Sequence, residues 1–300
     1  MPHAPVFAWL RAHFIAPASA RAGNLVILKA SGGRDYSDDF YREGRFASVR
    51  EVLIPPCASR SQADRAAPYV ERADIVLFAG GDQANYVRWK GSKLIAAVKG
   101  VYARGGIVGG GSAGLAIQGA VVYDSVAADR ILPDDEEVHT ADAVRNPMER
   151  AISFTTNLFA WPPLANTITD THFARRDRFG RLAAFMARAL QERLVNGDRI
   201  YGVAVDEDAV LLVDSTGVAT LYQRAREEGG YVPQGAWILM GSRSRRLRPG
   251  LPLSYTVEVT HLQHNGARYN LPAKKGGGRS YRVTVNGSRT PPYTPADPYR

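Results

Sequence analysis

The sequence predicts an α/β protein with a mostly parallel sheet, helices on both faces of that sheet, and a β-rich C-terminal section. Two observations predict this fold class. Between about residues 24 and 215, short runs rich in Val, Ile and Leu alternate with segments of helical spacing, which is typical of a three-layer α/β/α arrangement. After about residue 215, the apolar runs are short, alternate with polar residues, and are separated by Gly and Pro.

The individual elements follow from these patterns. Strands of the parallel sheet are expected at residues 24–29, 49–54, 74–79, from 107 onward, at 166–170 and at 200–205. Helices are expected at residues 61–72 (capped by Ser61), 93–104 and within 175–194. The C-terminal strands are expected at residues 218–223, 236–240, 253–259 and 279–285, before a proline-rich tail at 291–300. The segment 124–150, which contains the acidic loop 133–137, is expected to be a surface excursion or lid.

Composition excludes several classes of protein. The chain has 300 residues, of which 45% are hydrophobic and 22% charged, as in a globular protein with a full core. Cys57 is the single cysteine, so an internal disulfide and a multi-cysteine metal site are both excluded. No apolar run reaches the length of about 20 residues that a membrane-spanning helix needs.

The ends of the chain and its charge leave alternatives open. Residues 1–22 fit either an N-terminal arm or the remnant of an export signal, so the location of the protein stays undetermined. The net charge is +9, with basic clusters at 243–248 and around Lys274 and Arg279. Such clusters bind phosphate backbones in some proteins, but no nucleic-acid module surrounds them here, and solvated loops are the favoured interpretation.

A glycine-rich turn around Ser112 is the first candidate for chemistry. Residues 110–114 fit G-x-S-x-G, the pattern that presents a serine at the tip of a strand-to-helix turn. The helix that follows directs its backbone amides toward an oxyanion formed at that serine. The alternative is a structural turn in which Ser112 caps the helix.

Two further strand ends carry polar residues. The strand near 166 leads into Asp170-Thr171-His172-Phe173, and the strand near 200 leads into Asp206-Glu207-Asp208. In a parallel sheet, loops at the carboxyl ends of the strands carry the ligand site. A serine, a histidine and a carboxylate at such ends are a nucleophile, a general base and an orienting acid. The order along the chain differs from that of α/β-hydrolases, in which the acid precedes the histidine.

These motifs together resemble those of the cyanophycinase family, which belongs with peptidase E among the serine peptidases. The resemblance covers about residues 24–215 and rests on Gly80-Gly81-Asp82-Gln83, the turn at 110–114, the 170–173 motif with the arginines after it, and 205–208. It implies a flavodoxin-like, glutamine-amidotransferase-like sheet in a catalytic domain at 23–215, and the alternating pattern after residue 215 predicts a β-rich section at 216–290 packed on that sheet. It also implies hydrolysis of β-aspartyl-arginine isopeptide linkages through an acyl-enzyme, by a homodimer without metal or cofactor.

The resemblance also assigns roles to individual residues. Ser112 is the expected nucleophile, His172 its base and Glu207 the acid, while Asp206 and Asp208 compete for the acid role. The backbone amides of Gly81 and Ala113 are the expected oxyanion hole. The expected substrate-contacting residues are Gln83, Asp170, Thr171, Arg176, Arg178 and Arg181. Each has a structural alternative, such as a turn residue for Gln83 or a solvated helix face for the arginines.

The chain departs from the family pattern at two positions. Thr171 stands where the family usually has glutamine, and Gly111 where it usually has threonine. These differences leave two alternative functions open: an aspartyl dipeptidase for small peptides, and a non-catalytic binding protein of the same fold. Polyanion binding by the basic C-terminal section is ranked last. His139, His261 and His264 are interpreted as structural.

Overall fold

The chain forms two compact units, residues 2–117 and residues 118–300, which are described separately as the N-terminal unit and the C-terminal unit. The computed structural model describes residues 3–13, 22–32, 35–133, 137–225, 230–243 and 246–299. The predicted boundaries at residues 22, 215 and 290 stay predictions, and part of the predicted N-terminal arm lies outside the described residues.

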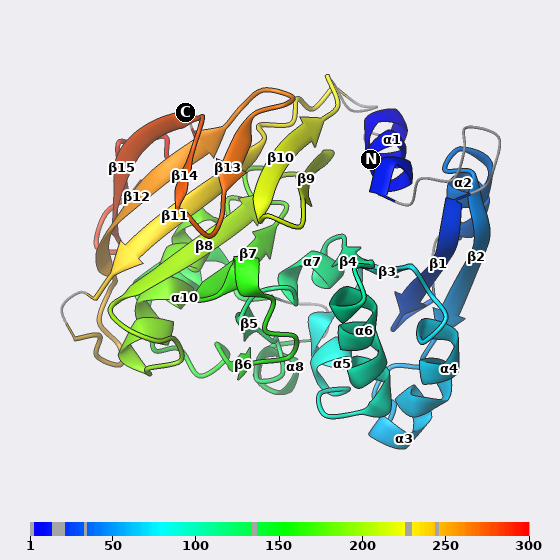
Figure 1. Ribbon diagram of the computed structural model, residues 1–300. Coiled ribbons are helices and arrows are strands. Elements are labelled where there is room, and N and C mark those ends of the chain that lie inside the picture. The colour runs from blue at the N-terminus through cyan, green and yellow to red at the C-terminus, as the bar shows by residue number, and fades with distance from the viewer. Residues whose placement is uncertain are drawn as a thin grey trace. The chain divides into compact units, whose positions relative to one another are not determined.

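The N-terminal unit contains a four-stranded parallel sheet in the order β2-β1-β3-β4 (Figure 1). Its strands are β1 Ala22–Lys29, β2 Phe46–Leu53, β3 Ile75–Phe78 and β4 Ile107–Gly110. They form where the expected Val, Ile and Leu runs lie, because such side chains pack well on both faces of a parallel sheet. Leu25, Ile75 and Val76 are fully buried in this sheet.

The helices of this unit precede, connect and follow these strands. They are α1 His3–His13, α2 Ser37–Arg42, α3 Arg60–Ala63, the 3₁₀ turn η1 Asp64–Ala66, α4 Ala67–Val70, α5 Gln83–Val87, α6 Lys93–Ala103 and α7 Ala113–Ala116. The prediction of one helix at 61–72 is wrong, because the segment begins at Arg60 and is divided into α3, η1 and α4. Ser59, not Ser61, caps it, because the Ser59 side chain and Gln62 form a reciprocal capping box. Pro68 then falls in the first turn of a separate helix, α4.

Helix α1 packs within the N-terminal unit. Phe7 and Leu10 are buried, and the ring of Phe7 meets Phe40 edge to face at 5.3 Å. The described part of the expected arm is therefore a helix that contributes to a core cluster with β1 and β2.

The C-terminal unit is built on an eight-stranded sheet in the order β16-β15-β12-β11-β8-β7-β5-β6. These strands are β5 Val121–Tyr123, β6 Phe154–Thr156, β7 Thr167–Thr171, β8 Arg199–Val205, β11 Ala236–Ser242, β12 Ser254–Leu262, β15 Arg279–Asn286 and β16 Tyr293–Thr294. β5, β7 and β8 run parallel, and the other pairs of neighbours are antiparallel. A smaller antiparallel sheet contains β9 Ala209–Val213, β10 Val218–Gln223, β13 Arg268–Asn270 and β14 Lys275–Gly276.

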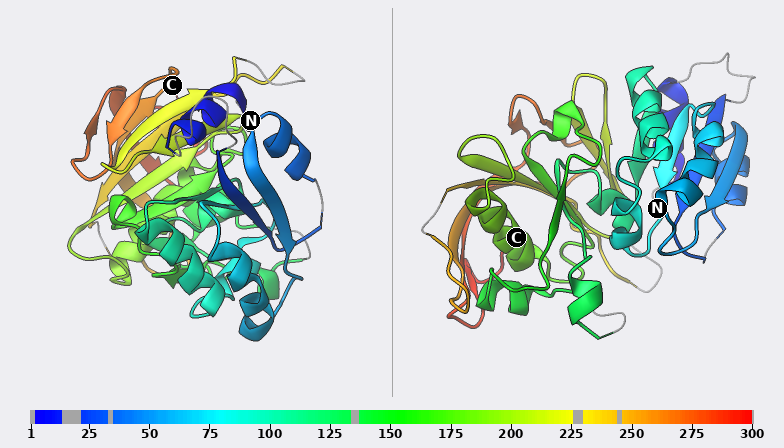
Figure 2. Two further views of the ribbon diagram at one scale, coloured as in Figure 1. Left: turned by 45° about the vertical axis from the view of Figure 1, so that its right-hand side comes forward. Right: turned by 90° about the horizontal axis from the view of Figure 1, so that it is seen from below.

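One long helix covers a face of the large sheet (Figure 2). Helix α10, Phe179–Gln191, packs against β7, β8, β11 and β12. Its apolar stripe includes Leu182, Phe185 and Met186, which are fully or almost fully buried, and the ring of Phe185 stacks on Tyr123 at 4.4 Å. The helix begins at Phe179 rather than near residue 175, because residues 172–178 form turns in which His172 and Asp177 have positive φ.

The segment 124–150 is not the expected surface excursion. It contains α8 Ala128–Ile131 and α9 Thr140–Arg145, and Val138, Ala143 and Val144 are buried in the main core cluster. Its apolar residues have no regular period, so their burial was not visible in the sequence. Residues 134–136 of the acidic loop lie outside the described residues.

The last described residues pack against the start of α10. β16 pairs with β15, and the ring of Tyr299 lies 5.9 Å from that of Phe179. The Tyr293 and Tyr299 hydroxyls both donate to Asp177 and accept the backbone amides of Gly180 and Phe179, respectively. The proline-rich tail expected at 291–300 is thus held, in its described part, by four hydrogen bonds to α10 and its preceding turn.

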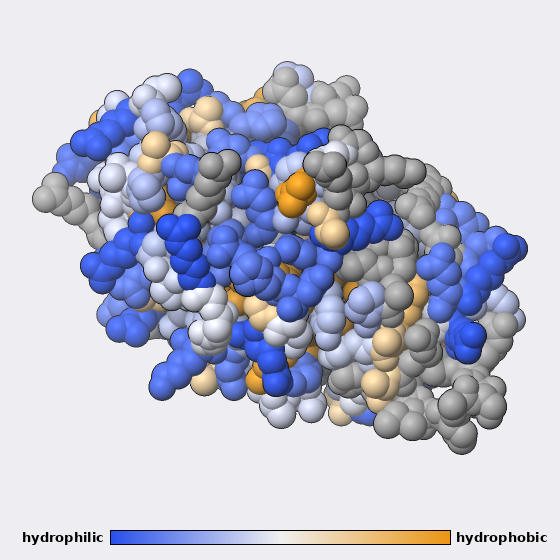
Figure 3. Space-filling model, turned by 90° about the horizontal axis from the view of Figure 1, so that it is seen from above, coloured by the Kyte–Doolittle hydropathy of each residue, from blue (hydrophilic) through white to orange (hydrophobic). Residues whose placement is uncertain are grey.

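The exposed residues are mostly hydrophilic on the face drawn in Figure 3, where hydrophobic residues form small separate spots. Part of the basic stretch 243–248 lies outside the described residues, while Lys274 lies over the Tyr201 ring at 4.0 Å. None of the described helices has the length and apolarity that crossing a membrane requires. The observed mixed α/β fold, with a parallel sheet and a β-rich C-terminal part, agrees with the predicted fold class.

Candidate active site

Ser112 has a backbone conformation that only glycine adopts readily. Its φ of 53° and ψ of −121° lie in a strained region. Ser112 stands between β4 and α7 and occupies the cap position of α7, but its side chain makes no capping hydrogen bond to that helix. Helix capping therefore does not explain why a serine is at this position.

The glycines around Ser112 are required by close packing. A Cβ on Gly114 would lie 2.1 Å from the Phe78 carbonyl oxygen, and one on Gly110 would lie 2.5 Å from the same atom. Such distances are far below van der Waals contact, so a larger residue at position 110 would push β4 away from β3, and one at position 114 would push α7 away from β3. Gly111 is different, because a Cβ there meets no atom within 4 Å.

The loop after β3 lies beside Ser112 within the N-terminal unit. β3 and β4 are paired with Phe78 opposite Gly110, so their carboxyl ends are adjacent. A Cβ on Gly80 would lie 3.4 Å from the Ser112 Cβ, and Gly81 has a φ of 123°. Asp82 then caps α5 by accepting the Ala84 amide at 2.9 Å, and Gln83 is the first residue of that helix. Ala113 is the first residue of α7, so its amide has no partner within the helix.

In the C-terminal unit, His172 and Glu207 form a hydrogen-bonded pair. β7 and β8 are parallel with Thr171 opposite Val205, so the residues that follow both strands meet at one edge of the sheet. The His172 Nδ1 lies 2.6 Å from the Glu207 Oε1. A carboxylate can only accept, so Nδ1 carries the proton and Nε2 is the basic nitrogen of the neutral imidazole. Both side chains are about one-fifth exposed, at 19% and 21%.

Asp206, the neighbouring carboxylate, is used to hold the backbone. It is buried and accepts the amides of Ala174, Arg175 and Gln234 and the hydroxyl of Tyr231. These four donors tie the turn after His172 to the segment before β11. Because its oxygens have these partners, Asp206 is unsuited to the acid role, whereas Glu207 contacts the imidazole.

Arginines surround the His172–Glu207 pair. Arg176 Nε lies 3.7 Å from Glu207 Oε1 and Arg175 Nε lies 3.9 Å from Glu207 Oε2, and both arginine side chains are half exposed. Burial lowers the pKa of His172, and the positive charge of Arg176 lowers this pKa further, while Glu207 opposes the shift. The net pKa is below the usual 6.5, so the imidazole is a neutral base at pH 7.

Arg178 and Arg181 are buried and form ion pairs within the protein. Arg181 donates to both oxygens of Asp170, at 2.6 and 3.0 Å, and to Glu137 at 2.9 Å. Arg178 donates to the carbonyl and hydroxyl oxygens of Thr171, each at 3.0 Å, and to Glu137. Burial disfavours the charge of Glu137, but Arg181 and Arg178 outweigh this effect and lower its pKa to about 2.

The structure thus separates the expected substrate residues into two groups. Asp170, Thr171, Arg178 and Arg181 lie in one buried network with Glu137, while Arg176 is half exposed and lies 3.7 Å from Glu207 and 3.8 Å from Glu137. Sequence reasoning missed Glu137, Arg175 and Tyr231. Glu137 was assigned to a surface loop, and Arg175 stands next to Arg176 and stacks on the Tyr231 ring at 4.6 Å. Among the described residues, no cluster of three or more His, Cys, Asp or Glu side chains could hold a metal ion.

Comparisons with known proteins give little similarity. No family model matches the chain, and no curated protein matches its sequence. The solved structures that match include a peptidase from an acI-B1 Actinobacterium, with 15% identity, coverage of 92% of this chain and 91% of that chain, and a TM-score of 0.47. They also include a candidate peptidase E from Listeria monocytogenes EGD-e, with 11% identity, coverage of 74% and 94%, and a TM-score of 0.39. Similarity this low leaves the function to be inferred from the residues of the chain itself.

Proposed function

We propose that the chain is a serine-type peptidase with Ser112 as nucleophile, His172 as general base and Glu207 as the acid that orients the imidazole. The observation that carries this proposal is the strained conformation of Ser112 at the strand-to-helix turn, with glycine packing on either side and no capping role. Strain of this kind persists at sites where it serves the chemistry. The His172–Glu207 pair in the C-terminal unit supports the proposal independently.

The proposed reaction has two halves. His172 Nε2 accepts the proton of the Ser112 hydroxyl while the Ser112 Oγ attacks the scissile carbonyl carbon. The tetrahedral intermediate collapses, His172 protonates the leaving amine, and an ester on Ser112 remains. Water then attacks the ester, again losing its proton to His172, and the carboxylate product leaves. Glu207 stabilises the imidazolium that forms in both halves.

The oxyanion of the intermediate needs hydrogen-bond donors. We assign this role to the backbone amides of Gly81 and Ala113. Gly80 lies against Ser112, and Ala113 begins a helix whose first amides have no helical acceptor. Each such donor contributes a factor of about 10²–10³ to the rate in a comparable enzyme.

The proposed substrate is a β-aspartyl-arginine isopeptide linkage, as in the storage polymer cyanophycin. This substrate offers carboxylates and a guanidinium. Arg176 and Gln83 are the proposed contacts, since Arg176 is half exposed. The other expected substrate residues contact one another in the protein interior, which favours a structural role. They hold the end of β7, from which His172 extends; these residues are Asp170, Thr171, Arg178 and Arg181. A flavodoxin-like, glutamine-amidotransferase-like arrangement and a homodimer remain parts of this proposal.

The test is release of β-Asp-Arg dipeptide from cyanophycin by the purified chain. We expect Ser112→Ala to keep its fold and to lose activity by a factor of at least about 10⁴. Ser61→Ala, which removes an exposed hydroxyl of the same unit, is the matched control and should retain activity. A fluorophosphonate probe should label the wild type and Ser61→Ala, but not Ser112→Ala.

The possible outcomes distinguish the alternatives. Labelling without release of dipeptide from the polymer would keep the serine chemistry and point to an aspartyl dipeptidase, which a panel of aspartyl dipeptides would identify. Absence of both labelling and hydrolysis would overturn the peptidase proposal and favour a non-catalytic binding protein.

A further inference from the structure

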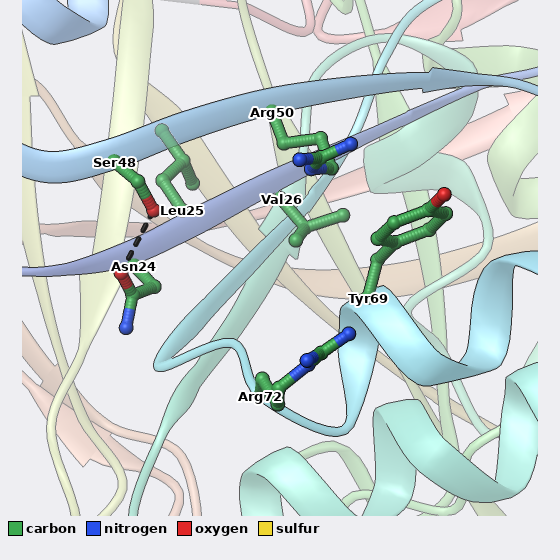
Figure 4. A pocket seen from close by; sticks show the side chains of 7 residues that line it. All are labelled: Asn24, Leu25, Val26, Ser48, Arg50, Tyr69 and Arg72. Carbon is green, nitrogen blue, oxygen red and sulfur yellow. Dashed lines mark hydrogen bonds between the residues drawn. The ribbon is translucent and has the colours of Figure 1, made fainter.

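The N-terminal unit contains a pocket at the edge of its sheet opposite Ser112. Seven residues line it: Asn24, Leu25, Val26, Ser48, Arg50, Tyr69 and Arg72 (Figure 4). Its volume is about 300 Å³. It lies toward the amino ends of the parallel strands, whereas Ser112 follows the carboxyl end of β4, so the pocket has no part in the proposed peptidase chemistry.

The sheet register explains why polar side chains gather here. In the parallel pairing of β1 and β2, Asn24 lies opposite Ser48 and Val26 lies opposite Arg50. Because side chains alternate between faces, these four share one face of the two strands. Tyr69 from α4 and Arg72 from the turn before β3 stand over the same face (Figure 4).

The hydrogen bonds within the pocket orient its donors. Ser48 donates to the Asn24 Oδ1 at 2.7 Å, which leaves the Asn24 amide nitrogen as a donor. The Arg50 guanidinium lies over the Tyr69 ring at 4.6 Å, so this stack fixes its plane. Arg72 donates through Nε to the Pro68 carbonyl at 3.2 Å, which leaves the two terminal nitrogens of its guanidinium.

Among the described residues, no carboxylate neutralises the charge of this pocket. No carboxylate is among the lining residues. In the described part of the chain, neither Arg50 nor Arg72 forms an ion pair. The neighbouring Asp74 does not line the pocket and accepts the Asn24 backbone amide at 2.7 Å. Two guanidinium groups, an amide and a phenol therefore face a cavity whose floor includes the apolar side chain of Val26.

We propose that this pocket binds a small dianion whose negative charge is carried by phosphate or carboxylate oxygens. Guanidinium groups bind both kinds of oxyanion through paired, charge-assisted hydrogen bonds. Asn24 adds neutral donors, and the apolar floor fits the carbon skeleton of a carboxylate or a phosphate ester. The proposal does not depend on the proposed peptidase function.

Calorimetric titration of the full chain with inorganic phosphate, and separately with succinate, tests the proposal and distinguishes its two sources of charge. We expect saturable binding of at least one of them that chloride at equal ionic strength does not displace. Arg50→Gln and Arg72→Gln should each weaken that binding by at least about tenfold. Arg65→Gln, which removes an exposed arginine outside the pocket, should leave the binding unchanged.

Two results would overturn the proposal. One is the absence of saturable binding of both anions. The other is binding that Arg50→Gln leaves at wild-type strength. Circular dichroism and thermal melting establish that each variant is folded. Arg50 is exposed on an edge strand, so we expect Arg50→Gln to fold. This variant alone is sufficient for the test if Arg72→Gln is unstable.

Discussion

Asp206 and Glu207 are adjacent carboxylates with different contacts. Asp206 accepts four hydrogen bonds from the chain around it, and Glu207 contacts His172 and two half-exposed arginines. Neighbouring residues at a strand end project in opposite directions, which accounts for this division. The alternation alone could not say which of the two would meet the histidine.

The acid role of Glu207 is tested by Glu207→Gln. We expect kcat to fall by a factor of about 10²–10⁴ with a small change in KM, because an amide no longer stabilises the imidazolium. Asp208→Asn is the matched control, since Asp208 forms an ion pair with Arg224 at 4.0 Å, and Arg224 is not part of the His172–Glu207 pair. Equal losses in the two variants would contradict the assigned role.

The pH dependence of activity depends on the pKa of His172. A base is active when deprotonated, so kcat/KM should rise with pH and level off above the pKa of His172, which lies below its usual value. Arg176→Gln removes a positive charge that disfavours the imidazolium. The pKa then rises, and the acid limb of the kcat/KM profile should move to higher pH.

The control is Arg193→Gln, which replaces an exposed arginine just after α10. It should leave the acid limb of the kcat/KM profile unchanged. An acid limb of Arg176→Gln that coincides with the wild-type limb would show that Arg176 does not act on the histidine. A lower plateau without a shift would indicate a contact with substrate alone.

At the scale of elements, the site depends on how β7, β8 and α10 are joined. The side chains of Arg178 and Arg181 extend back from the region of α10 to the end of β7 and to Glu137 before α9. Arg181 is 3% exposed, so its charge is stable only with its partners in place. The network thus holds the strand end that leads into His172.

Arg181→Met tests this network. The substitution removes the two hydrogen bonds of Arg181 to the buried Asp170 and leaves Arg178, 3.7 Å away, as the remaining counter-charge, so we expect the free energy of unfolding to fall by about 3–5 kcal/mol. Chemical denaturation measures this change. Asp170→Asn combined with Arg181→Met should be more stable than Arg181→Met alone, and Arg193→Gln should unfold like the wild type. A loss below about 1 kcal/mol in Arg181→Met would contradict the buried pairing.

Glu137 gives the network a pH dependence. Its pKa is about 2 in the folded protein and near 4.5 when unperturbed, so its stabilising contribution is present above pH 4.5 and is lost as the pH falls toward 2. The free energy of unfolding of Glu137→Gln should therefore depend less on pH in this range than that of the wild type. If the free energy of unfolding had the same pH dependence in Glu137→Gln and in the wild type, Glu137 would not belong to the network.

Elements with strong local signals were predictable, and those held by distant partners were not. The runs at 24–29, 200–205 and 218–223 lie within observed strands because Val, Ile and Leu there suit a sheet in any context. The burial of Arg178 and Arg181 depends on Asp170 and Glu137, and Glu137 is more than 40 positions away, so a solvated face was an equally good interpretation. The contact of His172 with Glu207 followed from adjacent parallel strands, but the choice among three acids needed side-chain geometry.

At the scale of the whole chain, residues far apart in sequence complete the start of α10. Tyr299 accepts the Phe179 amide at 3.0 Å and donates to Asp177 at 2.8 Å, while its ring packs against Phe173 and Trp237. These contacts stabilise the turn between His172 and α10. The C-terminal section is therefore part of the support for the candidate site.

Tyr299→Ala should lower the free energy of unfolding by about 2–3 kcal/mol, since it removes a packed ring and two hydrogen bonds. Tyr299→Phe should lose less, because the ring contacts remain. Thermal or chemical unfolding measures both, with Tyr102→Ala as the control for a more exposed tyrosine. If Tyr299→Ala were as stable as the control, the packing of this ring would not contribute to the free energy of unfolding.

The contact between Tyr299 and Phe179 spans 120 positions, and this has a consequence for the order of events during protein synthesis. Until residue 299 leaves the ribosome, the Phe179 amide at the start of α10 lacks its acceptor, and the aromatic cluster of Phe173 and Trp237 lacks a ring. Local contacts form early and distant ones late, so the histidine turn acquires this support only after residue 299 has been synthesised. A nascent chain that already contains Ser112, His172 and Glu207 would still lack Tyr299, which stabilises the turn that carries His172.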